Sequence, residues 1–144
     1  MNEEHTRQLL EEFPELWKYA GNLHVSLMGF GFECGNGWFP LLHKLCKNII
    51  EALKSEGNEF REGFYVIQIK EKFGGLRYYT SYGSKEIFGL INEAEDLSLK
   101  TCEVCGVEGK LMVRGRWYKT VCPRHAEELG YREIEKIGQQ GEAA

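Results

Sequence analysis

The sequence predicts an α+β fold, with helices packed on one face of a small antiparallel sheet and a compact module at the C-terminal end. Three observations support this fold class. A broad apolar stripe with helical spacing runs through residues 38–54, β-branched and aromatic residues dominate residues 63–82, and four cysteine and histidine residues stand in two pairs between positions 102 and 125. We expect the helices and the central β-hairpin to enclose one hydrophobic core.

The length of the chain limits its domain organisation. At 144 residues it can form one compact domain, or one domain with a small appended module. We place an α+β domain over residues 1–99, with its β-hairpin at 63–82, and a metal-binding module over residues 100–138. Only a short connection precedes the module, so we expect it to pack against the rest. Residues 139–144 lack apolar anchors and are predicted to form a flexible tail.

Charge and cysteine content restrict the function classes. The net charge of -4 argues against indiscriminate binding to polyanions. The acidic, polar start is unlike a secretory signal, and no apolar run approaches the roughly 20 residues that cross a bilayer. An odd count of five cysteines fits a reducing compartment better than a disulfide scaffold. We therefore expect a cytoplasmic protein without membrane association, and the sequence does not predict its oligomeric state.

The N-terminal half reads as two helices joined by an irregular segment. Residues 3–19 have the spacing of an amphipathic helix, which Pro14 interrupts. Residues 23–37 are apolar but punctuated by glycines, which favours a short strand or an irregular loop. Residues 38–54 carry an apolar stripe wide enough for a helix that is buried on more than one side.

Residues 63–82 are predicted to form a β-hairpin whose two-residue turn is Gly74-Gly75. This turn places Lys72 opposite Arg77 and Lys70 opposite Tyr79. The side-chain period of a strand then separates two faces. The predicted core face carries Tyr65, Ile67, Ile69, Phe73, Leu76, Tyr78 and Tyr82. The predicted solvent face carries Gln68, Lys70, Lys72, Arg77 and Tyr79. A helix over residues 84–99, with Ser84 as its N-cap, completes the domain.

The sequence Cys102-x2-Cys105, sixteen residues, Cys122-x2-His125 has the ligand spacing of structural zinc sites. Each pair can bind one edge of a tetrahedron. A hairpin around Gly115 is expected between the pairs. Pro123 is suited to the first position of a helix, and its predicted apolar stripe consists of Ala126, Leu129, Ile134 and Ile137. Knuckle, hairpin and helix in this order predict a treble-clef-type zinc module.

Four protein ligands leave no open coordination position, so the predicted zinc is structural rather than catalytic. A metal-dependent nuclease of treble-clef type carries a general base on the hairpin, and the hairpin RGRWYKT offers no histidine, aspartate or asparagine. Cys34 lacks a nearby histidine partner, and Cys46 lies on a helix face. We therefore lean against an enzyme, although a site assembled from distant residues stays open. The nuclease is a distant alternative.

Two basic surfaces are candidates for binding a partner. The first consists of Lys70, Lys72 and Arg77 with Tyr79, and its alternative interpretation is a solvated strand face. The second lies on the hairpin of the module. It consists of Lys110, Arg114, Arg116, Lys119 and Arg124 around Trp117 and Tyr118. Basic residues interleaved with aromatics can bind phosphates and stack on bases. The alternative is that Trp117 and Met112 pack the module onto the main domain.

Four stretches, GWFPLL (37–42), KEKFGGLRYY (70–79), TCEVCG (101–106) and WYKTVCPRHA (117–126), resemble a family of small, largely uncharacterised proteins encoded by bacteriophages and prophages. The resemblance covers roughly residues 33–126. It implies a phage accessory protein in the bacterial cytoplasm that binds a host component, such as a defence system or a nucleic-acid enzyme. The leading prediction is therefore a non-enzymatic, zinc-stabilised binding protein that recognises a host macromolecule, with inhibition of that macromolecule as one outcome of binding. The runner-up is a nucleic-acid-binding accessory protein that uses the zinc hairpin.

Overall fold

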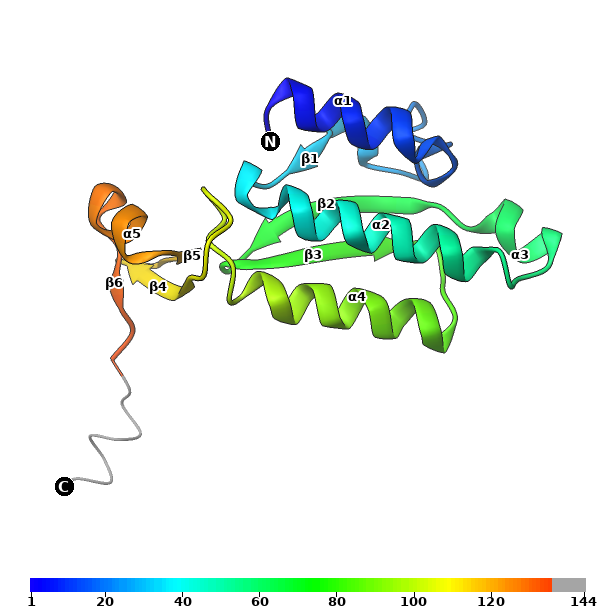
Figure 1. Ribbon diagram of the computed structural model, residues 1–144. Helices are drawn as coiled ribbons and strands as arrows, with labels where there is room; N and C mark the ends of the chain where they lie inside the picture. Colours follow the sequence, from blue (N-terminus) through cyan, green and yellow to red (C-terminus); the bar gives the residue numbers. More distant parts are fainter. Residues whose placement is uncertain (136–144) are drawn as a thin grey trace.

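The computed structural model describes residues 1–135 and has an α+β fold with two small sheets (Figure 1). The tail predicted over 139–144 and the predicted helical position Ile137 lie outside the described residues. The α-helices are α1 (Glu3–Glu12), α2 (Phe39–Leu53), α3 (Asn58–Gly63), α4 (Lys85–Ser98) and α5 (Pro123–Leu129). The strands are β1 (Phe32–Glu33), β2 (Val66–Lys72), β3 (Gly75–Thr80), β4 (Lys110–Arg114), β5 (Trp117–Val121) and β6 (Arg132–Glu133). No helix in this part of the chain is long and apolar enough to cross a membrane.

The main sheet has the order β1-β2-β3. Strands β2 and β3 form the predicted antiparallel hairpin, but β1 pairs with β2 in parallel. The prediction of an antiparallel sheet is therefore wrong for β1. The predicted irregular segment supplies this strand, because Phe32 extends alongside Ile69 while the segment before it stays in short turns.

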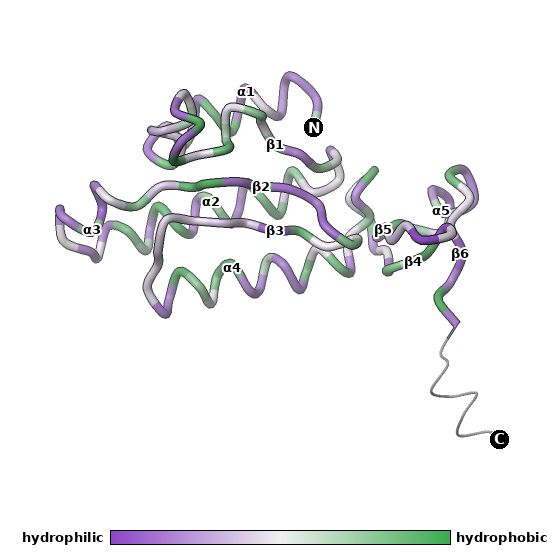
Figure 2. Tube along the Cα trace, turned by 180° about the vertical axis from the view of Figure 1, so that it is seen from behind, coloured by the Kyte–Doolittle hydropathy of each residue, from purple (hydrophilic) through white to green (hydrophobic). Residues whose placement is uncertain are grey.

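Helices α2 and α4 cover one face of the main sheet (Figure 1), and the view from behind shows β2 and β3 in front of α2 (Figure 2). We call the face turned away from these helices the open face. It carries the side chains that alternate with the buried positions on the three strands and that are exposed or half-buried: Glu33, Gln68, Lys70, Lys72, Arg77 and Tyr79.

The turn of the main hairpin is Phe73-Gly74 rather than the predicted Gly74-Gly75. Lys72 pairs with Gly75 and Lys70 pairs with Arg77, so the prediction that Lys72 faces Arg77 is wrong. Both turn residues have positive φ, 53° at Phe73 and 84° at Gly74, as a type I′ turn requires. A non-glycine residue in this region costs roughly 1–2 kcal/mol, which is why the sequence pattern favoured the two glycines.

Compared with the prediction, each residue over most of β2 pairs with a residue of β3 two positions earlier in the chain. Because side chains alternate with a period of two, this shift leaves the same residues on each face of the hairpin. Ile69, Leu76 and Tyr78 are buried against the helices as predicted. Phe73 is 67% exposed, which contradicts its predicted core position, because it lies in the turn and not in a strand.

A register shift between Val66 and Gln68 changes the alternation at the start of β2. As a result Val66 is buried, whereas Ile67, which was predicted to lie in the core, is only partly buried. Tyr82, also predicted in the core, is exposed, and its hydroxyl donates a hydrogen bond to the carbonyl of Phe60.

Pro14 and Ser84 stand at helix boundaries, as predicted. Pro14 ends the first helical segment and opens a short 3₁₀ helix, Pro14–Trp17. The Ser84 hydroxyl accepts a hydrogen bond from the Ile87 amide at 3.1 Å, which confirms the predicted N-cap of α4. At the other end of α4, Glu95 and Ser98 accept hydrogen bonds from the amides of Tyr78 and Leu76. Helix α4 thereby covers outward-facing amides of the edge strand β3.

The C-terminal module has a second sheet of order β5-β4-β6 beside helix α5. The hairpin β4–β5 turns at Gly115 as predicted, and Pro123 occupies the first turn of α5. The predicted continuation of this helix to Ile134 is wrong. Gly130 takes a left-handed conformation at the end of α5, and the chain then pairs with β4 as strand β6.

Candidate metal centre

Cys102, Cys105, Cys122 and His125 come together at the junction of three local structures. Cys102 and Cys105 lie on the turn that follows α4, Cys122 is the N-cap of α5, and His125 lies in the first turn of that helix. One ligand atom from each residue lies within 4.8 Å of all the others. This arrangement could hold a metal ion, as the spacing of the two pairs predicted.

The distances within the cluster describe a small polyhedron of donor atoms. The Sγ atoms of Cys105 and Cys122 are 3.8 Å apart. The Nδ1 atom of His125 lies 3.3 Å from the Cys122 sulfur and 3.7 Å from the Cys102 sulfur. A disulfide bond has a sulfur separation of about 2.05 Å, and all five cysteines of the chain are free. The thiols are therefore positioned to share one ion rather than to cross-link.

The backbone of the first pair forms a tight knuckle. The Gly106 amide donates to the Cys102 carbonyl at 2.9 Å, and the Cys102 amide donates to the Val107 carbonyl at 2.8 Å. Gly106 has a φ of 83°, a left-handed conformation that glycine adopts without steric cost. The knuckle therefore turns both thiols of the pair toward the same point.

The cluster favours a cation electrostatically. Burial opposes ionisation of the Cys102 thiol, but backbone amides of Cys105, Cys122 and Val104 favour the thiolate more strongly, and the pKa of Cys102 falls from 9.0 to about 7. The Val107 amide favours the thiolate of Cys105, yet burial and the neighbouring Cys102 and Cys122 thiols outweigh it and raise its pKa. Several thiolates at this spacing repel one another, so full ionisation requires a bound positive charge.

The knuckle rests directly on the backbone of the main domain. The Gly37 amide donates to the Glu103 carbonyl at 2.8 Å. A Cβ atom added at Gly37 would overlap the Cys102 carbonyl oxygen and would lie only 2.6 Å from the Gly106 nitrogen. Only a residue without a side chain permits this approach. The segment before α2 therefore forms part of the support of the metal cluster.

Glu103 links the same two regions through its side chain. Its carboxylate is almost fully buried, accepts a hydrogen bond from the Gly35 amide at 2.9 Å and forms an ion pair with Lys119 Nζ at 3.0 Å. Beside it, the Trp38 indole donates to the Thr101 carbonyl at 2.9 Å. Satisfied buried polar groups of this kind fix a single relative position of the parts that they join.

The tip of the main hairpin makes a further contact with the module. The Thr120 hydroxyl donates to the Gly74 carbonyl at 2.7 Å. A Cβ atom at Gly74 would overlap the Leu111 side chain and lie 3.3 Å from the Lys119 nitrogen. Together with the knuckle contacts, this confirms that the module packs against the rest of the chain.

The structure distinguishes the residues of the two predicted basic surfaces. Lys70, Lys72, Arg77 and Tyr79 lie on the open face, with Lys70 and Arg77 as direct cross-strand neighbours. On the module, Arg114 stacks over the Tyr131 ring and binds the Leu129 carbonyl, and Lys119 is bound to Glu103. Lys110 pairs with Glu133, and Arg124 pairs with Glu128. These four side chains are therefore engaged within the module.

Trp117 is 70% exposed and Arg116 is exposed beside it, at the tip of the β4–β5 hairpin. The alternative interpretation, in which Trp117 and Met112 pack the module onto the main domain, is therefore wrong for each of the two residues. Met112 is buried, but it belongs to the small core of the module itself.

Cys34 and Cys46 are buried in the main core and do not belong to the cluster, and burial raises the pKa of each thiol from 9.0 to about 12. Neither is a thiolate near neutral pH, so neither is poised as a nucleophile. Cys46 instead contacts the Tyr78 hydroxyl at 3.2 Å.

These two thiols predict a loss of stability in alkaline solution. Each folded-state pKa lies above the unfolded value of 9.0, so the neutral thiols favour the folded state fully below about pH 9, and this contribution disappears as the pH rises toward 12. Denaturant titrations at about pH 8 and about pH 11 should show the decline. A variant with both Cys34→Ala and Cys46→Ala should show a shallower decline, and an equal decline in both proteins would contradict this assignment.

Comparisons of the chain with protein-family models, with curated proteins and with solved structures found no match.

Proposed function

We propose that the chain is a non-enzymatic, zinc-stabilised binding protein that recognises a macromolecular partner through its open face and the tip of its β4–β5 hairpin. The observation that carries this proposal is that the candidate metal-binding residues and the exposed charged residues lie in different places. The four ligand atoms lie together in the module, which is hydrogen-bonded to the main domain, while charged and aromatic side chains are exposed on the open face and at the hairpin tip.

Zinc is the ion that the donor set supports best. Three thiolates and one imidazole are a common structural zinc set. A tetrahedron with metal–sulfur bonds of about 2.3 Å and metal–nitrogen bonds of about 2.0 Å has edges of about 3.8 Å between sulfurs and about 3.5 Å between sulfur and nitrogen. The separations of 3.8, 3.7 and 3.3 Å in the cluster are close to these edges. Knuckle, hairpin and helix in sequence further support a treble-clef-type module.

Four protein ligands argue for a structural ion. An ion held by Cys102, Cys105, Cys122 and His125 has no position left for a substrate or a reactive water molecule. In addition, Arg114 and Lys119, which would otherwise be free to bind substrate, are engaged in contacts inside the module. The ion therefore contributes folding energy to a segment whose own apolar core is small.

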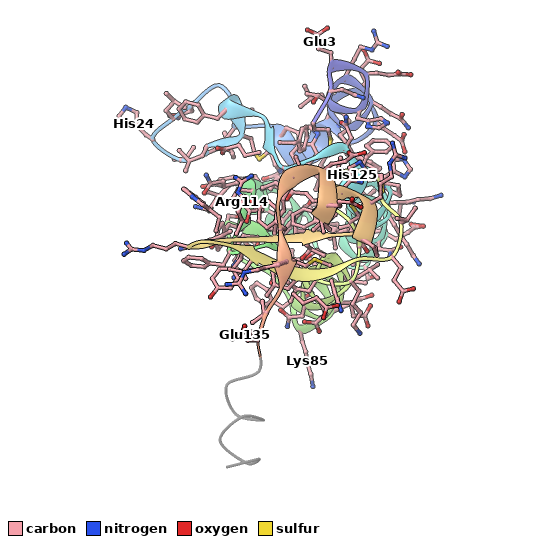
Figure 3. All side chains as sticks on the ribbon, turned by 90° about the vertical axis from the view of Figure 1, so that its left-hand side faces the viewer. Glu3, His24, Lys85, Arg114, His125 and Glu135 are labelled. Atoms are coloured by element: carbon pink, nitrogen blue, oxygen red, sulfur yellow. The ribbon has the colours of Figure 1, made fainter. Side chains whose placement is uncertain are left out.

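The surface for the partner combines the open face with the exposed hairpin tip. Seen from the end of the molecule, the β4–β5 hairpin projects to the left, the side on which the open face and His24 also lie (Figure 3). Lys70 and Arg77 are adjacent on this face, and such like-charged neighbours gain free energy when an anionic group binds between them. One candidate partner is a host protein with an acidic surface, in keeping with the phage resemblance.

Charge reversal tests this surface. We expect Arg77→Glu and Arg116→Glu to abolish capture of the partner from a bacterial lysate, with the free energy of unfolding changed by less than about 0.5 kcal/mol, because both side chains lie outside the core. Lys47→Glu on α2 is the matched control, since Lys47 is an exposed cation on the helical side. Mass spectrometry identifies the captured molecule. Equal capture by all variants would rule out the proposed surface.

The second candidate function is nucleic-acid binding, and the exposure of Trp117 beside Arg116 favours it. A cation next to an accessible aromatic ring can bind a phosphate while a base stacks on the ring. In this case the affinity for short DNA or RNA should fall with rising salt, and a slope of zero in a plot of log affinity against log salt concentration would exclude it.

A further inference from the structure

The turn at Phe73-Gly74 combines backbone strain with exposure. Phe73 has a φ of 53°, which bulky residues rarely adopt, and asparagine or glycine is the usual occupant of this turn position. Strain of this kind persists only where the surrounding structure fixes the backbone. The Phe73 ring is 67% exposed, so nothing gained in packing offsets the strain. A strained position that presents an apolar ring to solvent points to a role in binding.

The turn is held in one conformation by contacts on both sides. The Gly74 amide donates to the Glu71 carboxylate at 2.6 Å, and the Gly74 carbonyl accepts from Thr120 at 2.7 Å. Leu111 packs where a side chain of residue 74 would be. The ring of Phe73 is therefore presented from a fixed support, which lowers the entropy lost when a ligand binds to it.

Positive charges surround the exposed rings of this region. The ammonium group of Lys72 lies 5.6 Å from the centre of the Phe73 ring. Arg116 precedes Trp117 at the tip of the neighbouring hairpin, and Thr120, which binds the Phe73-Gly74 turn, lies on the same strand as Trp117. Tyr79 is exposed on the open face between these groups and the far end of β3. Exposed rings and cations thus stand at the tips of both hairpins and on the open face, although Trp117 and Thr120 lie on opposite faces of β5.

We infer that the partner bound by this surface is a single-stranded nucleic acid, whose unpaired bases stack on Phe73 and Trp117 while its phosphates contact Lys70, Lys72, Arg77 and Arg116. The inference rests on the proposed binding function, and of the two classes of partner considered there, a protein and a nucleic acid, it selects the nucleic acid. Stacking on two exposed rings requires unpaired bases, which excludes a duplex as the preferred ligand. A uniformly anionic backbone also suits like-charged neighbours such as Lys70 and Arg77.

The composition of the open face favours a nucleic acid over a protein. The centre of a protein–protein interface is depleted in lysine and glutamate, whereas arginine and aromatic residues are enriched there. The open face carries Lys70 and Lys72, while the Glu33 carboxylate on the edge strand β1 accepts a hydrogen bond from Gln68 at 3.2 Å. Such a face binds an extended charged chain more readily than an apolar protein surface.

The test uses the full chain loaded with zinc and fluorescein-labelled 12-nucleotide oligodeoxythymidylate, oligouridylate of the same length and a 12-base-pair DNA duplex at low salt. We expect the wild type to bind the single strands more tightly than the duplex. Phe73→Asn should weaken single-strand binding roughly tenfold, because it removes one stacking ring. The same variant should raise the melting temperature by roughly 2–4 °C, because asparagine tolerates positive φ.

Two further variants make the test specific. Phe73→Tyr keeps a stacking ring and should retain the wild-type affinity. Phe88→Ala removes another exposed ring, which lies on α4 on the helical side, and should leave the affinity unchanged.

The outcomes separate the inference from the function on which it rests. Single-strand binding that is unaffected by Phe73→Asn, a duplex bound as tightly as the single strand, or a Phe73→Asn variant that is less stable than the wild type would overturn the stacking inference alone. If no oligonucleotide binds but a protein partner is captured in an Arg77-dependent manner, the inference is overturned and the proposed function stands. If neither binds, both are overturned.

Discussion

His125→Ala is expected to unfold the C-terminal module while leaving the main sheet folded. His125 is one of four residues that could together hold a metal ion, and complete zinc binding in small modules provides roughly 10–16 kcal/mol. Loss of one ligand should therefore remove about 3 kcal/mol or more, in a segment whose own apolar core consists of a few residues. Hydrogen exchange of the Cys102 and Gly106 amides, which are hydrogen-bonded in the knuckle, reports the change.

His24→Ala is the matched control for this experiment. His24 is exposed on a loop far from the cluster (Figure 3), so its removal should change neither zinc content nor exchange. Removing the ion from the wild type with a chelator should reproduce the exchange pattern of His125→Ala. Equal protection of the knuckle in the two histidine variants would contradict a stabilising role for the ion.

Gly37→Ala is expected to separate the module from the main domain. The added methyl group would overlap the Cys102 carbonyl oxygen and press on the backbone of Gly106, neither of which can rotate away as a side chain does. Overpacking of this kind costs about 3 kcal/mol when the surrounding backbone is fixed. Because the clash falls on the knuckle, the variant loaded with zinc should also release the ion faster to a colorimetric chelator than the wild type loaded in the same way.

Gly89→Ala is the control for the same chemical change. Gly89 lies within α4, and a Cβ atom there meets nothing within 4 Å. Alanine is the better helix former by roughly 0.5–1 kcal/mol, so this variant should be more stable than the wild type. Denaturant titrations of the two variants should therefore move in opposite directions. If Gly37→Ala were as stable as the wild type, the knuckle would not rest on this segment.

The sequence was most informative where structure is local. The cysteine and histidine spacing predicted the ligand cluster, because a knuckle and the first turn of a helix each fix two ligands within four residues of chain. The N-cap Ser84 and the interruption at Pro14 were predicted for the same reason. Periodicity also assigned Ile69, Leu76 and Tyr78 to the buried face of the hairpin.

The sequence was least informative where contacts join distant segments. Glu103 and Gly37 were missed as supports of the metal cluster, because their contact spans more than sixty positions and leaves no periodic pattern. The glycines in CGNGW, just before a helix, were the available signal, since glycine often marks a close approach of two backbones. The turn at Phe73-Gly74 was misplaced by one residue because the contact of Gly74 with Leu111 and Thr120 lies outside the hairpin.

The helix predicted to run through Ile134 shows the same limit. Apolar spacing continues past Gly130, but this glycine adopts a left-handed conformation that ends α5. The residues that follow form strand β6, which pairs with β4. The glycine itself was the signal for a helix end, and the apolar spacing beyond it was coincidental.

X-ray absorption spectroscopy at the zinc edge, combined with elemental analysis of protein purified without added metal, tests the central claim most directly. The account predicts one zinc ion per chain with three sulfur neighbours at about 2.3 Å and one nitrogen neighbour at about 2.0 Å. Protein without stoichiometric metal, or an ion with an oxygen atom among its four neighbours, would contradict a closed structural site.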